Sequence, residues 1–369
     1  MTERGQQIAR VVAAFIGLAC LHAAGDAFGQ GAMRDQSGTL TATPTSQTKT
    51  TWLEQHFAGS IAEVTTYIGS GTLYTSGYHD SYVADAFYVR PSYQLGTKYK
   101  LSLNARVYVE EEWTTPDNAT GRRFNPLDSW IYLTSKDLYT MPRAKIRFSG
   151  SLRTVIPISY ESRYANLVTA LGASGAAART FEFGRPDTQG KRWELSTSLG
   201  LGYTKGIYSS DLRGSFPGDT SGCRQTDPVA VTSGPGGPSP TETDRCGGPL
   251  NTSFTITSSG NIALSRGRYS LSMTLIVINQ FKYAIDQTTT NLIVAQTDTV
   301  PRGREDFTWG IISAGYDISD HLSVSLGIAS YQPALDSTYQ HLRFPFFDVT
   351  AGANANNYAQ LLVGVTGTL

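Results

Sequence analysis

The sequence predicts an all-β protein, a transmembrane antiparallel up-and-down β-barrel of twelve strands. Three observations support this fold class. Apolar and polar residues alternate over long segments, short and long connections alternate between those segments, and the last segment keeps its alternation to the final residue. A period of two residues gives a strand one apolar and one polar face, as a wall between lipid and lumen requires.

The alternation defines the predicted strands. In one of them Leu101 and Val107 are apolar, whereas intervening residues such as Ser102 and Arg106 are polar. In the predicted strand 163–183, residues Ala170 to Ala178 could equally form a short helix. The predicted strands are longer than the strands of globular proteins, which usually have about five or six residues. They are long enough for a tilted membrane strand, which needs about 9 to 11 residues. They lie near residues 61–74, 82–95, 98–113, 127–138, 143–158, 163–183, 190–208, 252–265, 267–282, 305–318, 321–332 and 355–369.

The connections fall into two alternating sets. Bacterial barrels have short periplasmic turns and long outer loops, whereas a β-sandwich does not require this alternation. An even number of strands then places both ends of the barrel chain on the periplasmic side. The short set is Gly96–Thr97, Tyr139–Pro142, Gly184–Gln189, Arg266 and Ser319–Asp320, and the long set includes Thr114–Pro126, Ser209–Asn251, Tyr283–Arg304 and Pro333–Asn354.

The N-terminal residues 1–29 have the features of a cleaved secretory signal peptide. Arg4 and Arg10 precede the apolar run Val11 to Leu21, and small residues follow it. The run is too short for a spanning helix, which needs about 20 residues. Residues 30–56 are largely Thr, Ser and Gln and predict a flexible periplasmic linker, which leaves residues 57–369 for the barrel.

Cys223 and Cys246 flank a segment rich in Pro and Gly within the loop 209–251. Two cysteines in an exported chain predict a disulfide that ties the loop. A metal-binding pair is the alternative, although no histidine lies near either cysteine in the sequence. The loop itself is expected to be a protected surface loop, with a lid or ligand loop as the alternative.

The composition excludes a bulk electrostatic attraction to nucleic acid, because the formal net charge is +0. Charged residues make up 16 % of the chain, below the roughly 25 % of soluble domains. The 37 glycines and 20 tyrosines suit glycine-rich strands with aromatic side chains near lipid headgroups.

The last predicted strand resembles the C-terminal strand of bacterial outer-membrane proteins. Apolar residues alternate from Ala359 through Val363 to Leu369, and the chain ends on the strand. In that class the final residue is often an aromatic that the assembly machinery reads, whereas Leu369 is apolar but not aromatic. The resemblance implies location in the outer membrane of a Gram-negative-type bacterium, with lipid and the assembly machinery as partners.

Charged residues on the polar faces are predicted to line the lumen, because a charge on the lipid face costs about 2 to 4 kcal/mol at the midplane. Other polar faces, such as Thr255 to Asn261 and Ser270 to Thr274, carry hydroxyls instead. The charges either pair across strands and plug the barrel, or form a basic stripe that attracts anions. The predicted pore-lining residues are Arg90, Lys100, Arg106, Glu110, Glu112, Lys145, Arg147 and Arg153.

No histidine pair has metal-ligand spacing, and the sequence indicates no cofactor. Twelve strands also resemble the outer-membrane phospholipase family, which implies a Ser–His–Asn site on the outer wall. His321 and Ser323 share the inward face of one strand, and no local sequence matches that family's motif. We therefore expect a non-enzymatic channel for small hydrophilic or amphiphilic solutes. The alternatives are a closed structural or adhesive barrel acting through its loops and, third, a membrane-embedded hydrolase.

Overall fold

The computed structural model describes residues 52–69, 82–96, 101–113, 123–186, 190–209, 251–283, 303–335, 342–346 and 359–369. The signal peptide, most of the linker and both cysteines of the predicted disulfide lie outside these residues. The last residues of the predicted linker, from Trp52, belong to a short helix, α2 (Trp52–Phe57). No helix in these ranges is long and apolar enough to span a bilayer.

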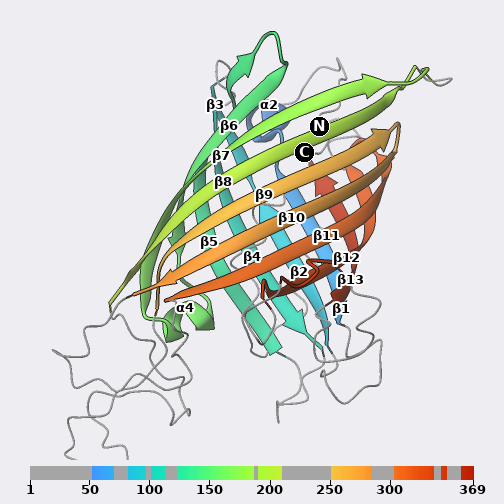
Figure 1. Ribbon diagram of the computed structural model, residues 1–369. Helices are drawn as coiled ribbons and strands as arrows, with labels where there is room; N and C mark the ends of the chain where they lie inside the picture. Colours follow the sequence, from blue (N-terminus) through green and yellow to red (C-terminus); the bar gives the residue numbers. More distant parts are fainter. Residues whose placement is uncertain are drawn as a thin grey trace, which may run out of the picture.

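The described strands form one antiparallel sheet that closes on itself (Figure 1). β2 and β3 both pair with β4 and are separated only by Pro91, which has no N–H to donate to the ladder. They act as one interrupted strand, so the thirteen strands form a barrel of twelve, as predicted. The strands are β1 (Ile61–Gly69), β2 (Val83–Arg90), β3 (Ser92–Gly96), β4 (Leu101–Glu112), β5 (Arg123–Met141), β6 (Ile146–Ile156), β7 (Leu167–Phe183), β8 (Trp193–Tyr208), β9 (Thr252–Arg266), β10 (Tyr269–Lys282), β11 (Arg304–Ser319), β12 (Leu322–Pro333) and β13 (Ala359–Thr368).

The two ends of the barrel differ in their connections. At the terminal end, where β1 begins and β13 ends, two adjoining strand pairs are separated by only two residues each, Gly267–Arg268 and Asp320–His321. The Gly59 N–H donates to Leu369 O at 2.7 Å there, which joins the two ends of the described chain. At the loop end, the connections from β8 to β9 and from β10 to β11 run from 209 to 251 and from 283 to 303.

Several predicted boundaries differ from the structure. The turn predicted at Arg266 lies at Gly267–Arg268, because β9 continues to Arg266. The turn predicted at Tyr139–Pro142 lies instead at residues 142–145, because β5 continues to Met141. The strand predicted from residue 163 begins at Leu167, because a helix, α4 (Tyr160–Tyr164), precedes it. Ser159 caps that helix by accepting from the Ser162 N–H at 3.1 Å. Residues 170–178 are strand, paired with both β6 and β8, so the helical alternative is excluded.

Exposure separates the inner from the outer face of the wall. On β4, Leu103 and Val107 are 43 % and 48 % exposed, whereas Arg106 between them is 1 % exposed. Apolar side chains that face out of a membrane barrel meet lipid, and polar ones face the lumen. The face that carries Arg106 is therefore the inner face, and register extends this assignment to every paired strand.

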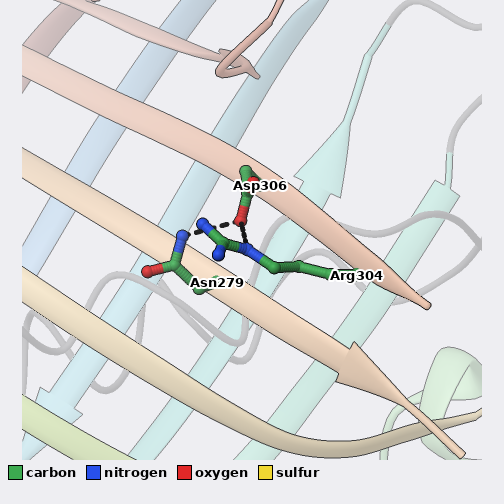
Figure 2. A network of polar contacts seen from close by, with 3 residues as sticks. All are labelled: Asn279, Arg304 and Asp306. Atoms are coloured by element: carbon green, nitrogen blue, oxygen red, sulfur yellow. Dashed lines mark hydrogen bonds and ion pairs between the residues drawn. The ribbon is translucent and has the colours of Figure 1, made fainter. Parts of the chain in front are cut away.

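The outer apolar band has a defined height. On β10 the band runs from Tyr269 to Val277, and the next outward-facing residue is the polar Asn279. This span matches the length of a membrane strand, which has about 9 to 11 residues in the bilayer. Figure 2 shows the polar network at this boundary, in which Asn279 and Arg304 both donate to the Asp306 carboxylate, at 2.7 and 2.6 Å. Aromatic pairs lie near both edges of the band: Tyr269 with Tyr316, and Phe254 with Phe281.

One segment packs against the outer wall over the loop-end part of the band, where Gly310 pairs with Leu275. This strap, residues 342–346, donates the Arg343 N–H to Ala334 O and accepts from Gln332 at Phe344 O. Gly310 on β11 lies under it, and a Cβ there would come within 2.7 Å of the Phe346 ring. The glycine is therefore required for the close approach of the strap.

Candidate functional site in the barrel interior

A row of large side chains crosses the inner face of β2, β4 and β5. Val89 pairs with Val107 and Ser92 with Asn104, so Arg90 and Arg106 fall on the same rung of the sheet. Arg106 then pairs directly with Trp130 on β5. The next inner position on β5, Tyr132, pairs with Arg153 on β6. The register thus brings together three of the predicted lumen arginines and two aromatic residues that were not predicted.

Arg106 is surrounded by aromatic rings. Its guanidinium carbon lies 5.2 Å from the centroid of Trp130, 5.5 Å from that of Tyr108 and 5.9 Å from that of Tyr88. Arg153 reaches the same indole at 4.2 Å. The faces of aromatic rings attract cations, and the attraction strengthens where water is excluded. These contacts hold two positive charges against one indole inside the barrel.

Arg153 lies along the wall. It crosses Gly172 on β7 and donates through Nη2 to the Thr204 hydroxyl on β8. A Cβ at Gly172 would approach Arg153 Nε to 2.6 Å, so only glycine leaves room for the side chain in this path. The arginine therefore spans three strands at the surface of the wall.

Several buried polar atoms in this row lack hydrogen-bond partners among the described residues. They are Arg90 Nε, the Trp130 indole N–H and the Tyr132 hydroxyl. Trp130 and Tyr132 are 4 % and 8 % exposed. A buried donor without a partner costs about 1 to 3 kcal/mol, so such groups in a native protein call for a water or ligand acceptor.

The remaining predicted lumen residues lie apart from this row. Glu110, buried on β4, accepts from the Tyr82 hydroxyl at 2.6 Å, and Glu112 is half-buried at the loop end of the same face. Arg147 is exposed on the inner face of β6 near the terminal end. Lys145, expected on a strand, lies in the turn before β6 with a φ of 52° and an exposed side chain. Lys100 lies outside the described residues.

The opposite wall carries an apolar cluster that the sequence reading missed. Ile276, Ile278 and Trp309 are buried on the inner faces of β10 and β11 and pack together with Ala329. Ile276 interrupts the polar face of its strand, and this exception in the alternation is the sequence feature that indicates an apolar inner wall. Leu362 on β13 packs against this cluster and also against the cluster that contains Tyr108. Leu362 therefore links the apolar wall to the aromatic wall.

Hydroxyl groups line part of the inner face toward the terminal end, and Ser272 on β10 belongs to the polar face that the sequence predicts to be hydroxylic. Ser272 and Ser313 lie within hydrogen-bond distance at 2.9 Å, and Ser151 and Ser174 at 2.8 Å. Hydroxyls therefore line the terminal part of the interior together with the exposed Arg147, whereas the arginine, aromatic and apolar contacts lie nearer the loop end.

The described residues contain no group of three His, Cys, Asp or Glu side chains placed to hold a metal ion. His321 lies in the turn between β11 and β12, where its Nδ1 is 3.1 Å from Thr368 O. His56 Nδ1 lies 3.0 Å from Trp52 O within α2. The first contact joins the β11–β12 turn to the end of β13, and the second lies within one short helix.

No protein-family model and no curated protein matches this chain. Similar solved structures include an outer membrane channel from Pseudomonas putida F1, with a TM-score of 0.43 and 12 % identity over 85 % of this chain and 96 % of that chain. Outer membrane phospholipase A from Escherichia coli has a TM-score of 0.30 and 10 % identity over 85 % and 93 %. The outer membrane protein opdK from Pseudomonas aeruginosa has a TM-score of 0.27 and 10 % identity over 85 % and 98 %. The chain resembles outer-membrane β-barrel proteins in fold, and the pairing of its own strands defines that fold.

Proposed function

We propose that this chain is a passive channel of a bacterial outer membrane, with a lumen that favours anionic solutes. The closed ring of strands and the outer apolar band support insertion in a bilayer. In this proposal the terminal end faces the periplasm and the loop end faces outward. Residues 1–29 would direct export, and the assembly machinery would insert the barrel.

One observation carries the proposal: Arg90, Arg106 and Arg153 lie on one sector of the inner wall. Burying an ion costs several kcal/mol unless neighbouring groups offset the loss of hydration. A barrel whose interior is only to be closed is therefore more stable when apolar side chains fill it. The opposite wall is filled in that way by Ile276 and Ile278. The arginines on the facing sector are therefore better explained by solute binding than by a role in filling the lumen.

A closed structural barrel is the second candidate, and a specific observation favours it. Arg106, Ile276 and Ile278 are at most 1 % exposed, so water does not reach these side chains. If this packing extends across the lumen, the loops rather than the interior carry the function. Hydrolase activity remains a third hypothesis, without a described site that supports it.

Conductance in planar bilayers distinguishes the two main candidates. We expect purified protein to give discrete current steps with a reversal potential that indicates anion preference. A protein that inserts but gives no steps would contradict the channel and support the closed barrel. Insertion is checked separately, because a folded membrane barrel fractionates with outer membranes and migrates faster unheated than boiled on a mild detergent gel. Recovery as a soluble monomer without detergent would contradict both candidates.

A further inference from the structure

The row of Arg90, Arg106, Trp130, Tyr132 and Arg153 (the arginine–aromatic row) has the composition of a binding site as well as that of a charged wall. We propose that it binds an aryl carboxylate, an organic anion with a flat apolar body. This inference rests on the proposed channel function and specifies its substrate class. Three features of the row carry it: charge, unpartnered donors and aromatic surface.

The donors define the charged end of the ligand. Arg90 Nε and the Trp130 indole N–H can only donate, and the Tyr132 hydroxyl can donate or accept. All three lack partners among the described residues, and they lie on two successive rungs of the same inner face. A carboxylate accepts several hydrogen bonds at once and carries the charge that neighbouring arginines favour.

The ring contacts define the body of the ligand. The guanidiniums of Arg106 and Arg153 already lie over the Trp130 ring, so this ring accepts contacts from planar groups. The facing wall is apolar, with Ile276, Ile278 and Trp309, and Leu362 joins it to the aromatic side. A small inorganic anion would satisfy the donors but would make no contact with the rings of Trp130 and Tyr132. An aryl carboxylate satisfies both sides.

In this proposal the ligand reaches the buried row through movement of side chains, while the strands stay paired. The path of Arg153 along the wall over Gly172 keeps its guanidinium near the row while the strands stay paired. Arginine side chains have many rotamers, and exchange between an aromatic neighbour and a carboxylate changes no backbone contact. We therefore expect binding without loss of the barrel.

Isothermal titration calorimetry of the full mature chain in detergent micelles tests the site directly. Sodium benzoate is the probe, with benzyl alcohol, cyclohexanecarboxylate and chloride as comparisons. Benzoate should bind at least about tenfold more tightly than benzyl alcohol, because the alcohol lacks the charge. Cyclohexanecarboxylate should be weaker than benzoate because it has no aromatic face, and chloride should compete only weakly. Equal affinity for benzoate and chloride would reject the aryl specificity.

Two pairs of variants locate the site. Trp130→Phe and Tyr132→Phe each remove one donor while keeping an aromatic side chain, and each should weaken benzoate binding by about tenfold. Trp193→Phe and Tyr203→Phe make the same changes on β8 outside the row and should leave the affinity unchanged. Benzoate binding that is absent, or that is unaffected by either row variant in a protein that still migrates as a folded barrel, would overturn the proposal.

The result separates this inference from the channel itself. Binding without conductance would leave the site standing and contradict the channel. Conductance without benzoate binding would leave the channel standing and contradict the site, with water as the acceptor of the three donors.

Discussion

Arg153 and Gly172 fit each other across the pairing of β6 and β7: the arginine side chain occupies the space that a Cβ on Gly172 would need. The two residues are register partners, and the hypothetical Cβ lies 2.6 Å from Arg153 Nε and 2.9 Å from its Cγ. Because the guanidinium also contacts Trp130 and Thr204, a change at Gly172 is transmitted to three strands. The glycine thus positions the charge on the inner wall.

This relationship predicts that Gly172→Ala lowers the free energy of unfolding by about 1 to 3 kcal/mol, the usual effect of overpacking. Arg153 must leave its path and lose its contact with Trp130. Gly175→Ala is the matched control on the same strand, because its Cβ would meet only an ordinary contact, 3.7 Å from Ser149 O. Urea unfolding in detergent measures both variants, and equal stabilities would contradict the fit.

The strands could be predicted from the sequence because the membrane and the lumen impose opposite polarity on neighbouring residues. Leu103 and Val107 face outward and Arg106 inward, as the alternation indicated. Period two fixes which side chains share a face but not their position across strands. The contact of Arg153 with Trp130 depends on register and on a bulge in β5, and the sequence does not encode these as a pattern.

The apolar inner wall was missed for a related reason. Ile278 and Trp309 lie on faces that were assumed to be polar because they point into the lumen. A lumen that is partly filled with apolar side chains breaks the rule that inner faces are polar. Helix α4 was missed because its five residues are too few to show a helical period.

The strap over Gly310 gives a second prediction. Gly310→Val should displace residues 342–346 from the outer wall and make cleavage by trypsin after Arg343 several-fold faster. In the wild-type chain the Arg343 N–H and Nε donate to Ala334 O and Leu335 O, both at 2.9 Å. Gly260→Val is the control, because a Cβ there would lie 3.7 Å from the Leu199 side chain. Unchanged cleavage in Gly310→Val would show that the strap does not depend on this approach.

Asp128 should be important for the connection between β6 and β7. Its carboxylate accepts from the Ile158 and Ser159 N–H groups, each at 3.0 Å, and from the Ser162 hydroxyl. Asp128→Ala leaves these donors without their acceptor and should lower the free energy of unfolding by about 1 to 3 kcal/mol. Asp137→Ala, which removes an acceptor for the exposed Thr140, should change it by less than about 0.5 kcal/mol. A smaller loss in Asp128→Ala than in Asp137→Ala would be the contrary result.

The disulfide between Cys223 and Cys246 stays a prediction, since both residues lie outside the described ranges. Mass mapping of non-reduced peptides from envelope-derived protein should link the two cysteines. Reduction should then accelerate proteolysis within the loop 209–251, because the cross-link restricts the unfolded loop. Two free thiols in protein taken directly from the envelope would reject the pairing.

The last prediction concerns where along the lumen the ion preference arises. Arg90 lies half-buried within the arginine–aromatic row, whereas Arg147 is exposed near the terminal end. A charge beside a low-dielectric wall is screened less than one in open solvent, so Arg90→Glu should shift the reversal potential more than Arg147→Glu.

Salt dependence sharpens the comparison. The Debye length falls from about 10 Å at 0.1 M to about 3 Å at 1 M, so the small effect of Arg147→Glu should disappear first as salt rises. The effect of Arg90→Glu should persist over more of that range because its side chain is half-buried against the wall. Reversal potentials measured at several mean salt concentrations with a fixed gradient test both statements. If both reversals shift the potential equally and decay together, the preference arises from the overall charge of the pore and the buried row has no special part in it.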